Sequence, residues 1–147
     1  GWYLDLPTTG EKQITNSILR DDRIIFTTYI PSTTPCNPGG DGWLMELNSL
    51  NGGRLNDTFD INNDGTINAT DRVTPVTGVS DTAAAGIKSN TSAGAPSSPV
   101  ILQGLPGTGT PRSCVEYKYS STTDGKVIKM QEACKSTRVR ESWQQLK

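Results

Sequence analysis

The chain has 147 residues and a formal net charge of -1, and hydrophobic residues make up 33% of it. This length corresponds to one domain, and the near-neutral charge provides no basic surface for nucleic acid or acidic lipid. No segment approaches the ~20 consecutive apolar residues of a membrane-spanning helix, so we expect no membrane insertion. The 15 glycines and 9 prolines favour short strands separated by turns, and the sequence therefore predicts an all-β fold.

Residues 1–59 predict a blade-like unit of four antiparallel strands. The first two strands are rich in β-branched residues, and Asp21-Asp22 between them indicates a tight hairpin. Asn51-Gly52-Gly53 predicts the turn before the fourth strand. Four strands in about forty residues are typical of one β-propeller blade. The predicted strands are residues 14–20, 23–30, 43–47 and 54–55.

Residues 60–71 carry oxygen-bearing side chains at the spacing of a known calcium-binding loop. A twelve-residue loop of this class takes its ligands from positions 1, 3, 5, 7, 9 and 12 and has glycine at position 6. Here Gly65 occupies position 6, and Ile67 occupies position 8, where an apolar side chain turns toward the core. The predicted Ca²⁺ ligands, in chain order, are Asp60, Asn62, Asp64, Thr66 through its main-chain oxygen, Asn68 and Asp71.

The flanks of this loop differ from those of a helix-loop-helix site. Pro75 follows the loop closely, and residues 56–59 have no apolar stripe of helical period. We therefore expect a strand-flanked calcium loop that acts as a local clamp. Because Asp71 is shorter than the usual glutamate at position 12, the expected affinity is roughly micromolar to millimolar. The alternative is a solvated turn, since Asn, Asp and Gly are common in loops.

The second half of the chain predicts a surface connection followed by a second blade-like unit. Residues 81–98 are mostly small and polar, so we expect them to cross the surface without burying much area. Residues 99–147 predict the second unit, which contains a hairpin between residues 114 and 134. Asp124-Gly125 provides the turn signal of this hairpin.

The chain has three cysteines, Cys36, Cys114 and Cys134. Folding the hairpin at Asp124 places Cys114 opposite Cys134, which predicts a disulfide; two separate thiols are the alternative. A disulfide would indicate export to an oxidising compartment. The same register sets Glu116 against Glu132, a like-charge pair that a bulge in the hairpin would relieve.

A series of segments in this order resembles the C-terminal region of the PilY-type proteins, the tip-associated adhesins of bacterial type IV pili. The resemblance is dense over residues 1–78, patchy to residue 103 and weak beyond it. The loop pattern of that family, Asp-x-Asn-x-Asp-x-x-x-Asp, matches at Asp60, Asn62 and Asp64, whereas its last carboxylate falls on Asn68. The matching segments begin with Gly1-Trp2-Tyr3-Leu4-Asp5-Leu6-Pro7 and include residues 23–31, Pro35-Cys36, Gly39-Gly40, residues 43–47, Gly52-Gly53-Arg54-Leu55, Phe59-Asp60, Gly86-Ile87-Lys88, residues 96–99 and Ser142-Trp143.

The resemblance implies a modified β-propeller, of which this chain would be the C-terminal part. It also implies a calcium site that regulates pilus biogenesis by extension and retraction, together with roles in twitching motility, cell adhesion and surface attachment. The implied partners are the minor pilins of the pilus tip complex, host or surface receptors, and the upstream remainder of the same propeller. The implied location is the cell surface or the pilus tip, after export.

Two other functions remain open from the sequence. A quinoprotein-like propeller enzyme shares blade-like segments, but the chain has no histidine, which removes the commonest general base. We therefore expect no enzyme activity. A dockerin-like, calcium-dependent protein-binding module has almost the same loop, but dockerins carry two such loops, each with a helix.

Overall fold

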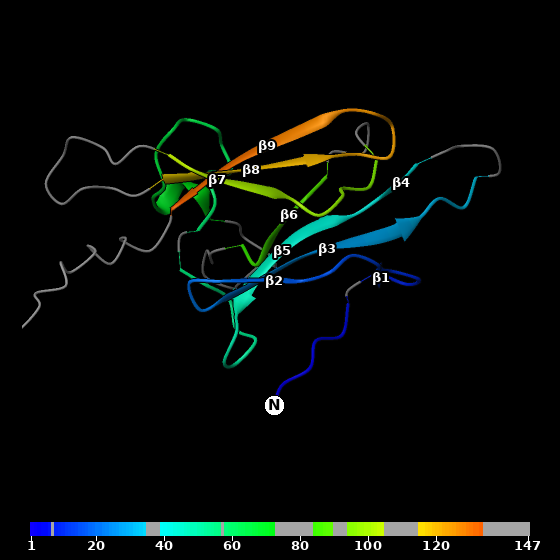
Figure 1. Ribbon diagram of the computed structural model, residues 1–147, viewed down its shortest axis with the longest axis horizontal. Coiled ribbons are helices and arrows are strands. Elements are labelled where there is room, and N and C mark those ends of the chain that lie inside the picture. The colour runs from blue at the N-terminus through cyan, green and yellow to red at the C-terminus, as the bar shows by residue number, and fades with distance from the viewer. Residues whose placement is uncertain are drawn as a thin grey trace, which may run out of the picture.

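The structure is a computed structural model that describes residues 1–6, 8–34, 39–56, 58–72, 84–89, 94–104 and 115–133 (Figure 1). Within these ranges the chain forms antiparallel sheets, and its helical content is one short 3-10 turn, η1 (Ala69–Asp71). The all-β prediction is confirmed, and the antiparallel sheets are consistent with a propeller fragment. Among the helices of the described ranges, none has the length and hydropathy needed to cross a membrane.

The first sheet is built around the long strand β3, which pairs with strands on both of its edges. β1 and β2 pair with one edge of β3, β4 and β5 pair with the other, and β6 pairs with the outer edge of β5. The chain therefore contributes four strand positions side by side, as expected for a blade. The strands are β1 (Lys12–Gln13), β2 (Ile18–Arg20), β3 (Arg23–Pro31), β4 (Gly40–Asp41), β5 (Trp43–Asn48) and β6 (Gly86–Lys88).

The hairpin predicted at Asp21-Asp22 is confirmed. Both residues have positive φ, 50° and 62°, which is the backbone geometry of the two-residue turn that matches strand twist. Aspartate tolerates this left-handed region better than most residues because its side chain bonds locally. The turn fixes Arg20 opposite Arg23.

The fourth strand of the first sheet is not the one that the sequence predicted. Residue 54 makes only an isolated bridge to Leu47, and β6, from the expected surface connection, takes the edge position. The small residues that suggested an exposed segment instead permit close packing: a Cβ on Gly86 would lie 2.5 Å from the Leu44 carbonyl oxygen. Ala95, further along the same segment, is also buried. The described part of residues 81–98 therefore belongs to the folded core.

The second sheet has the order β7-β8-β9 and follows the predicted hairpin. Its strands are β7 (Val100–Gln103), β8 (Val115–Ser121) and β9 (Val127–Ala133). Glu116 lies opposite Glu132 and Val115 lies opposite Ala133, with continuous pairing down to Ser121. The register expected from Asp124-Gly125 is thus confirmed without a bulge. The part of the second predicted unit after Ala133 and the residues Cys36, Cys114 and Cys134 lie outside the described residues.

The two sheets lie one above the other (Figure 1), and an apolar core is buried where they face each other. Ile25 and Leu44 from the first sheet contact Phe59 and Met130 in this core. The other face of the first sheet carries a second cluster, against which the N-terminal residue Trp2 packs. Because β3 and β5 are buried on both faces, their sequences are apolar in successive positions as well as alternate ones. This second cluster consists of Phe26, Met45 and Leu47.

Candidate metal site: the loop of residues 60–71 and its surroundings

The loop is preceded by an extended segment, residues 58–60, which pairs with β9 and which we call the stem. Phe59 forms an antiparallel bridge with Glu132, the Asp60 N–H donates to the Gln131 carbonyl at 3.1 Å, and the Ala133 N–H donates to the Thr58 carbonyl at 3.1 Å. The extended flank on the N-terminal side of the loop agrees with the expectation from sequence. It differs from the helical flank of a dockerin. Pro75 and the flank after Arg72 lie outside the described residues.

The carboxylate of Asp60 closes the loop upon itself. Its Oδ1 accepts the Asp64 N–H at 3.1 Å, and its Oδ2 accepts the Gly65 N–H at 2.9 Å. Gly65 has φ +83°, which lets the chain turn sharply so that its N–H faces back toward position 1 of the loop. Asp60 is buried, so the first predicted ligand is held in one orientation at the base of the loop.

Asp71 performs the same task at the other end of the loop. Its Oδ1 accepts the N–H groups of Ile61 and Asn62, and its Oδ2 accepts the N–H of Asn68 at 2.9 Å. The last of these bonds completes a capping box, because the Asn68 side chain in turn accepts the main-chain N–H of Asp71; it also accepts the Thr70 N–H. Asp71 is 3% exposed, and it ties the start of the loop to η1.

The four remaining predicted ligands are exposed and form a chain of hydrogen bonds. Asn62 donates its Nδ2 to the Asp64 carboxylate at 3.0 Å, and Asp64 accepts the Thr66 hydroxyl at 2.6 Å. Asn68 donates its Nδ2 to the Thr66 hydroxyl at 3.0 Å. The structure thus brings all six predicted residues into one hydrogen-bonded loop, with Asp60 and Asp71 buried beneath the others.

The donor set of this loop fits a hard cation such as Ca²⁺. Every predicted ligand atom is an oxygen, which Ca²⁺ prefers. Each oxygen of Asp60 accepts one hydrogen bond, so each retains an acceptor position for a cation. In the described ranges no three His, Cys, Asp or Glu side chains converge on one point. A bound ion would therefore depend on amide and main-chain oxygens as well as on carboxylates.

Hydrogen bonds from Thr66 lower the pKa of the Asp64 carboxyl below 3.8, the side-chain bond more than the main-chain bond, and Asn62 adds to the effect. These bonds favour the charged form of the carboxyl group. A lowered native pKa stabilises the folded chain above pH 3.8, and this contribution is lost as the pH falls through the native value. Asp64 therefore stays ionised throughout the neutral range.

Replacing Thr66 with alanine is expected to raise the pKa of Asp64 toward 3.8, because the hydroxyl bond is lost while the main-chain bond remains. An NMR titration of the Asp64 carboxyl carbon measures this directly. Asp124 provides the internal control, since its pKa is lowered mainly by the hydroxyl of Thr122 and should not move. An unchanged Asp64 midpoint in Thr66→Ala would show that the hydroxyl bond does not form in solution.

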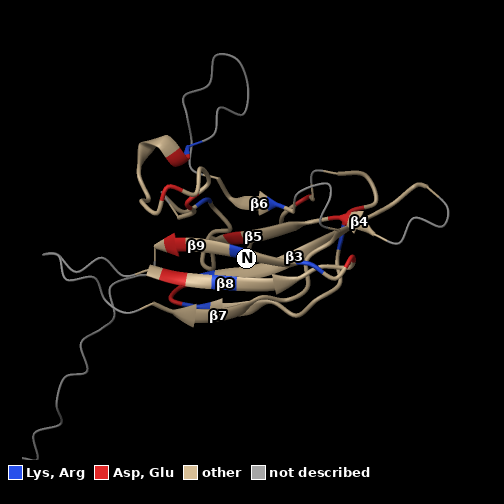
Figure 2. Cartoon of the chain, turned by 90° about the horizontal axis from the view of Figure 1, so that it is seen from above, with Lys and Arg blue, Asp and Glu red and all other residues tan. Residues whose placement is uncertain are grey.

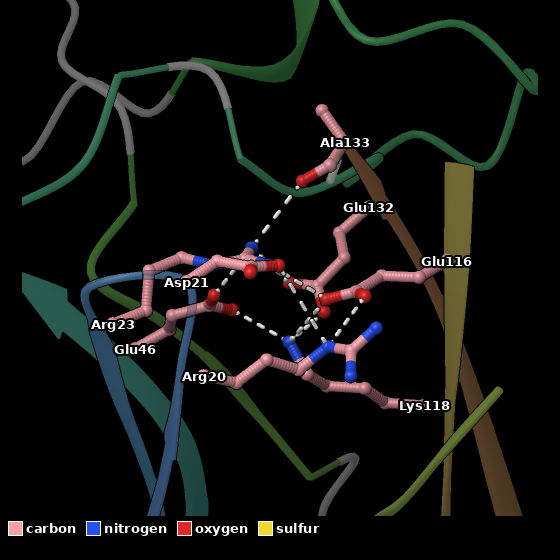
Figure 3. Close-up of polar contacts among 8 residues, drawn as sticks. All are labelled: Arg20, Asp21, Arg23, Glu46, Glu116, Lys118, Glu132 and Ala133. Carbon is pink, nitrogen blue, oxygen red and sulfur yellow. Dashed lines mark hydrogen bonds and ion pairs between the residues drawn. The ribbon is translucent and has the colours of Figure 1, made fainter. Parts of the chain in front are cut away.

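A second polar feature, which the sequence did not predict, lies between the sheets beneath the loop (Figure 3). Arg23 binds Glu46 at 2.6 Å and Glu116 at 2.7 Å. Lys118 binds Glu46 at 2.8 Å and also pairs with Glu132. We call these five residues, Arg23, Glu46, Glu116, Lys118 and Glu132, the buried ionic cluster. The three glutamates and Lys118 are 0% exposed, and Arg23 is 4% exposed.

Within the cluster three carboxylates face two cations. At its edge, Arg20, which is 34% exposed, adds a positive charge through its Nε, 3.0 Å from Glu116, and the exposed Asp21 adds a carboxylate 3.8 Å from Arg23. Burial lowers the pKa of the Lys118 amine, and the Glu46 carboxylate opposes this shift. Ion pairing therefore compensates the desolvation of Lys118 only in part.

The sequence contained a weak signal for this cluster. Charged and aromatic residues alternate along the start of β8, and Figure 2 shows its one acidic and one basic position. Alternation gives the two faces of a strand but not which face is buried. Here Glu116 and Lys118 point inward, while Tyr117 and Tyr119 are half-buried on the outer face. The predicted repulsion between Glu116 and Glu132 is offset, because Arg23 and Lys118 form ion pairs with these carboxylates.

The protein is thus an all-β chain of antiparallel sheets with an oxygen-rich loop at residues 60–71. Two curated relatives match this chain, and both are named type IV pilus biogenesis factor PilY1 homolog, from Xylella fastidiosa strain Temecula1. One is 35% identical over 108 residues, which cover 69% of this chain and 8% of the relative. The other is 37% identical over 59 residues, which cover 36% of this chain and 4% of the relative.

The two matches show that this chain is related to PilY1-type proteins, in agreement with the resemblance found in the sequence. The chain spans less than a tenth of the length of either relative. No protein-family model and no solved structure match it.

Proposed function

We propose that residues 60–71 bind Ca²⁺ and that the chain is a calcium-binding part of a PilY1-type protein that acts in type IV pilus biogenesis. The observation that carries the proposal is the closure of the loop by Asp60, whose carboxylate accepts both the Asp64 and the Gly65 N–H. This closure joins position 1 to positions 5 and 6 of the calcium-loop pattern. The names of the two relatives supply the biological context.

The finer parts of the function follow from the same proposal. The chain acts by binding and regulation and not by catalysis, and it is exported to the cell surface or pilus tip. Calcium binding regulates pilus extension and retraction, and through them twitching motility and surface attachment. The partners are the minor pilins of the pilus tip complex, surface or host receptors, and the upstream remainder of the same propeller.

The predicted ligands differ in how far they must rearrange when a cation binds. Asp60 and Asp71 are oriented by main-chain N–H groups, so they need little rearrangement when an ion binds. Asp64 and Asn62 are exposed and turn toward each other; a cation would replace their mutual hydrogen bond with two oxygen contacts. When bound, the ion supplies positive charge that offsets the repulsion between the three carboxylates. The loop then acts as a clamp on its stem.

Calcium is expected to raise the melting temperature of the wild-type chain. A ligand that binds only the folded state stabilises it by about 2.7 kcal/mol at 100 times its dissociation constant. For a domain of this size the corresponding shift is roughly 5–10 °C. Calorimetry in excess CaCl₂ and in chelator measures it. Asp64→Ala, which removes an exposed carboxylate, should fold without calcium but lose the shift.

The matched control is Asp124→Ala. Asp124, like Asp64, is exposed to solvent and accepts a threonine hydroxyl in a tight turn, but it lies outside the loop. Its removal should leave the calcium-dependent shift intact. Equal melting temperatures of the wild type in calcium and in chelator would refute the proposed calcium site.

A further inference from the structure

Strand β9 separates the loop from the buried ionic cluster and contacts both. Successive residues of a strand point to opposite faces of the sheet. Gln131 therefore points outward and reaches the loop, where its Nε2 donates to the Gly65 carbonyl at 3.1 Å. Glu132, the next residue, points inward and pairs with Lys118. One short segment of backbone, residues 131–133, thus belongs to both features.

The loop side of this segment is held by main-chain bonds. The Gln131 carbonyl accepts the Asp60 N–H, and the Ala133 N–H donates to Thr58. Asp60 is the first predicted ligand of the cation, so the register of the stem on β9 determines where its carboxylate lies. Together with the Gln131 side chain, these bonds place three contacts of β9 on the loop and its stem.

The cluster side of the same segment is held by charge. Arg23 donates from Nη1 to the Ala133 carbonyl at 3.3 Å while the same guanidinium binds Glu46 and Glu116. Neither carboxylate oxygen of Glu132 has a hydrogen-bond partner within the described residues, so its ion pairs with Lys118 and Arg23 are the contacts that hold this buried charge. A shift of β9 away from Lys118 and Arg23 would weaken the ion pairs that compensate the buried charge of Glu132.

We propose that β9 is the positioning element of the calcium loop, with Gln131 holding the loop directly and Glu132 coupling it to the buried ionic cluster. The inference rests on the proposed calcium site. Calcium binding fixes the loop and its stem, and the stem fixes residues 131–133 at the position in which the cluster is fully paired. Because coupling between two sites is reciprocal, disrupting the cluster is expected to weaken calcium binding.

Isothermal titration of the 147-residue chain with CaCl₂ tests the coupling. Glu132→Gln keeps the shape of the side chain and removes its charge, and it is expected to weaken calcium binding about five-fold or more. Glu11→Gln is the matched control: Glu11 is a buried glutamate that accepts hydrogen bonds from the Thr28 hydroxyl of β3 and from the main-chain N–H of Thr8, with no part in the cluster. Its calcium affinity should stay within about two-fold of the wild type. Equal affinities of the Glu132→Gln variant and the wild type would overturn the proposal.

A second variant tests the direct contact with the loop. Gln131→Ala removes the bond to Gly65 and should also weaken calcium binding about five-fold. Lys129→Ala changes the neighbouring outward-facing residue of β9, which lies over the Tyr117 ring, and should leave the affinity unchanged. Loss of the same affinity in both variants would show a general effect of β9 and not positioning by Gln131.

A measurement on the wild type covers the case in which Glu132→Gln does not fold. Calcium should shift the amide NMR signals of Glu116 and Lys118 on β8, which β9 separates from the stem, and should leave that of Glu11 in place. Unshifted signals on β8, in a chain that binds calcium by titration, would overturn the coupling and leave the calcium site standing. A wild type that binds no calcium would refute the proposed function itself.

Discussion

Replacing Arg23 with alanine is expected to lower the free energy of unfolding by about 3–5 kcal/mol, as removal of one partner from a buried ion pair does. Arg23 is 4% exposed and binds two glutamates that are fully buried. Without it, three carboxylates in the cluster face Lys118 and the half-exposed Arg20 alone. Denaturation in urea, read from the midpoint at constant slope, measures the loss.

Arg54→Ala is the control for this prediction. Arg54 makes an isolated bridge to Leu47 through its backbone, and its side chain is exposed. Surface substitutions of this kind change the free energy of unfolding by no more than about 0.5 kcal/mol. If the two arginine variants unfolded at the same urea concentration, the cluster would contribute nothing measurable to stability.

The parts of the fold that depend on local chemistry could be predicted from the sequence. The turn at Asp21-Asp22 and the hairpin around Asp124-Gly125 both follow from residues that favour left-handed backbone, and each turn sets the register of its strands. The hairpin even placed Glu116 opposite Glu132, as the structure does. Turn chemistry is encoded in a few adjacent residues, so no distant contact was needed to read it.

The parts that depend on distant contacts could not be predicted. The outer edge of β5 pairs with β6 (Gly86–Lys88). The residues expected at this edge, 54–55, come before the loop of residues 60–71 in the sequence, whereas β6 comes after it. That choice depends on the lack of a side chain at Gly86, which lets the two backbones approach. In the same way, the burial of Lys118 is accompanied by an ion pair with Glu46, which belongs to the first sheet and lies far from Lys118 in the sequence. Neither fact can be inferred from the sequence around the residue concerned.

The candidate site shows the same division. The spacing of residues 60–71 gave the ligand set, and the structure joins all of those residues by hydrogen bonds. The role of β9 was not visible in the sequence, because Gln131 lies far along the chain from Gly65 and in a different predicted unit. The loop is therefore connected to both sheets. It follows the strands of the first sheet along the chain, and its stem pairs with β9 of the second sheet.

Replacing Phe59 with alanine is expected to destabilise the chain by about 3–5 kcal/mol, the usual cost of truncating a buried aromatic residue. Phe59 is 2% exposed and packs with Ile25, Leu44 and Met130 between the sheets. It also precedes Asp60 and bridges Glu132 through its main chain. The substitution keeps this bridge but removes the ring that packs the loop stem against the core. The variant should therefore lose calcium affinity as well as stability.

Phe26→Ala separates these two effects. Phe26 is buried in the cluster on the other face of the first sheet, packed with Met45 and Leu47 and away from the stem, and its truncation should also cost about 3–5 kcal/mol. Urea denaturation should show similar losses for both variants, whereas calorimetric titration with CaCl₂ should show weaker binding for Phe59→Ala alone. If both variants bound calcium as the wild type does, the packing of Phe59 would support the fold but not the geometry of the loop. If both lost affinity equally, calcium binding would depend on overall stability and not on the stem, because Phe59 packs in the core between the sheets next to Asp60, whereas Phe26 packs on the other face of the first sheet.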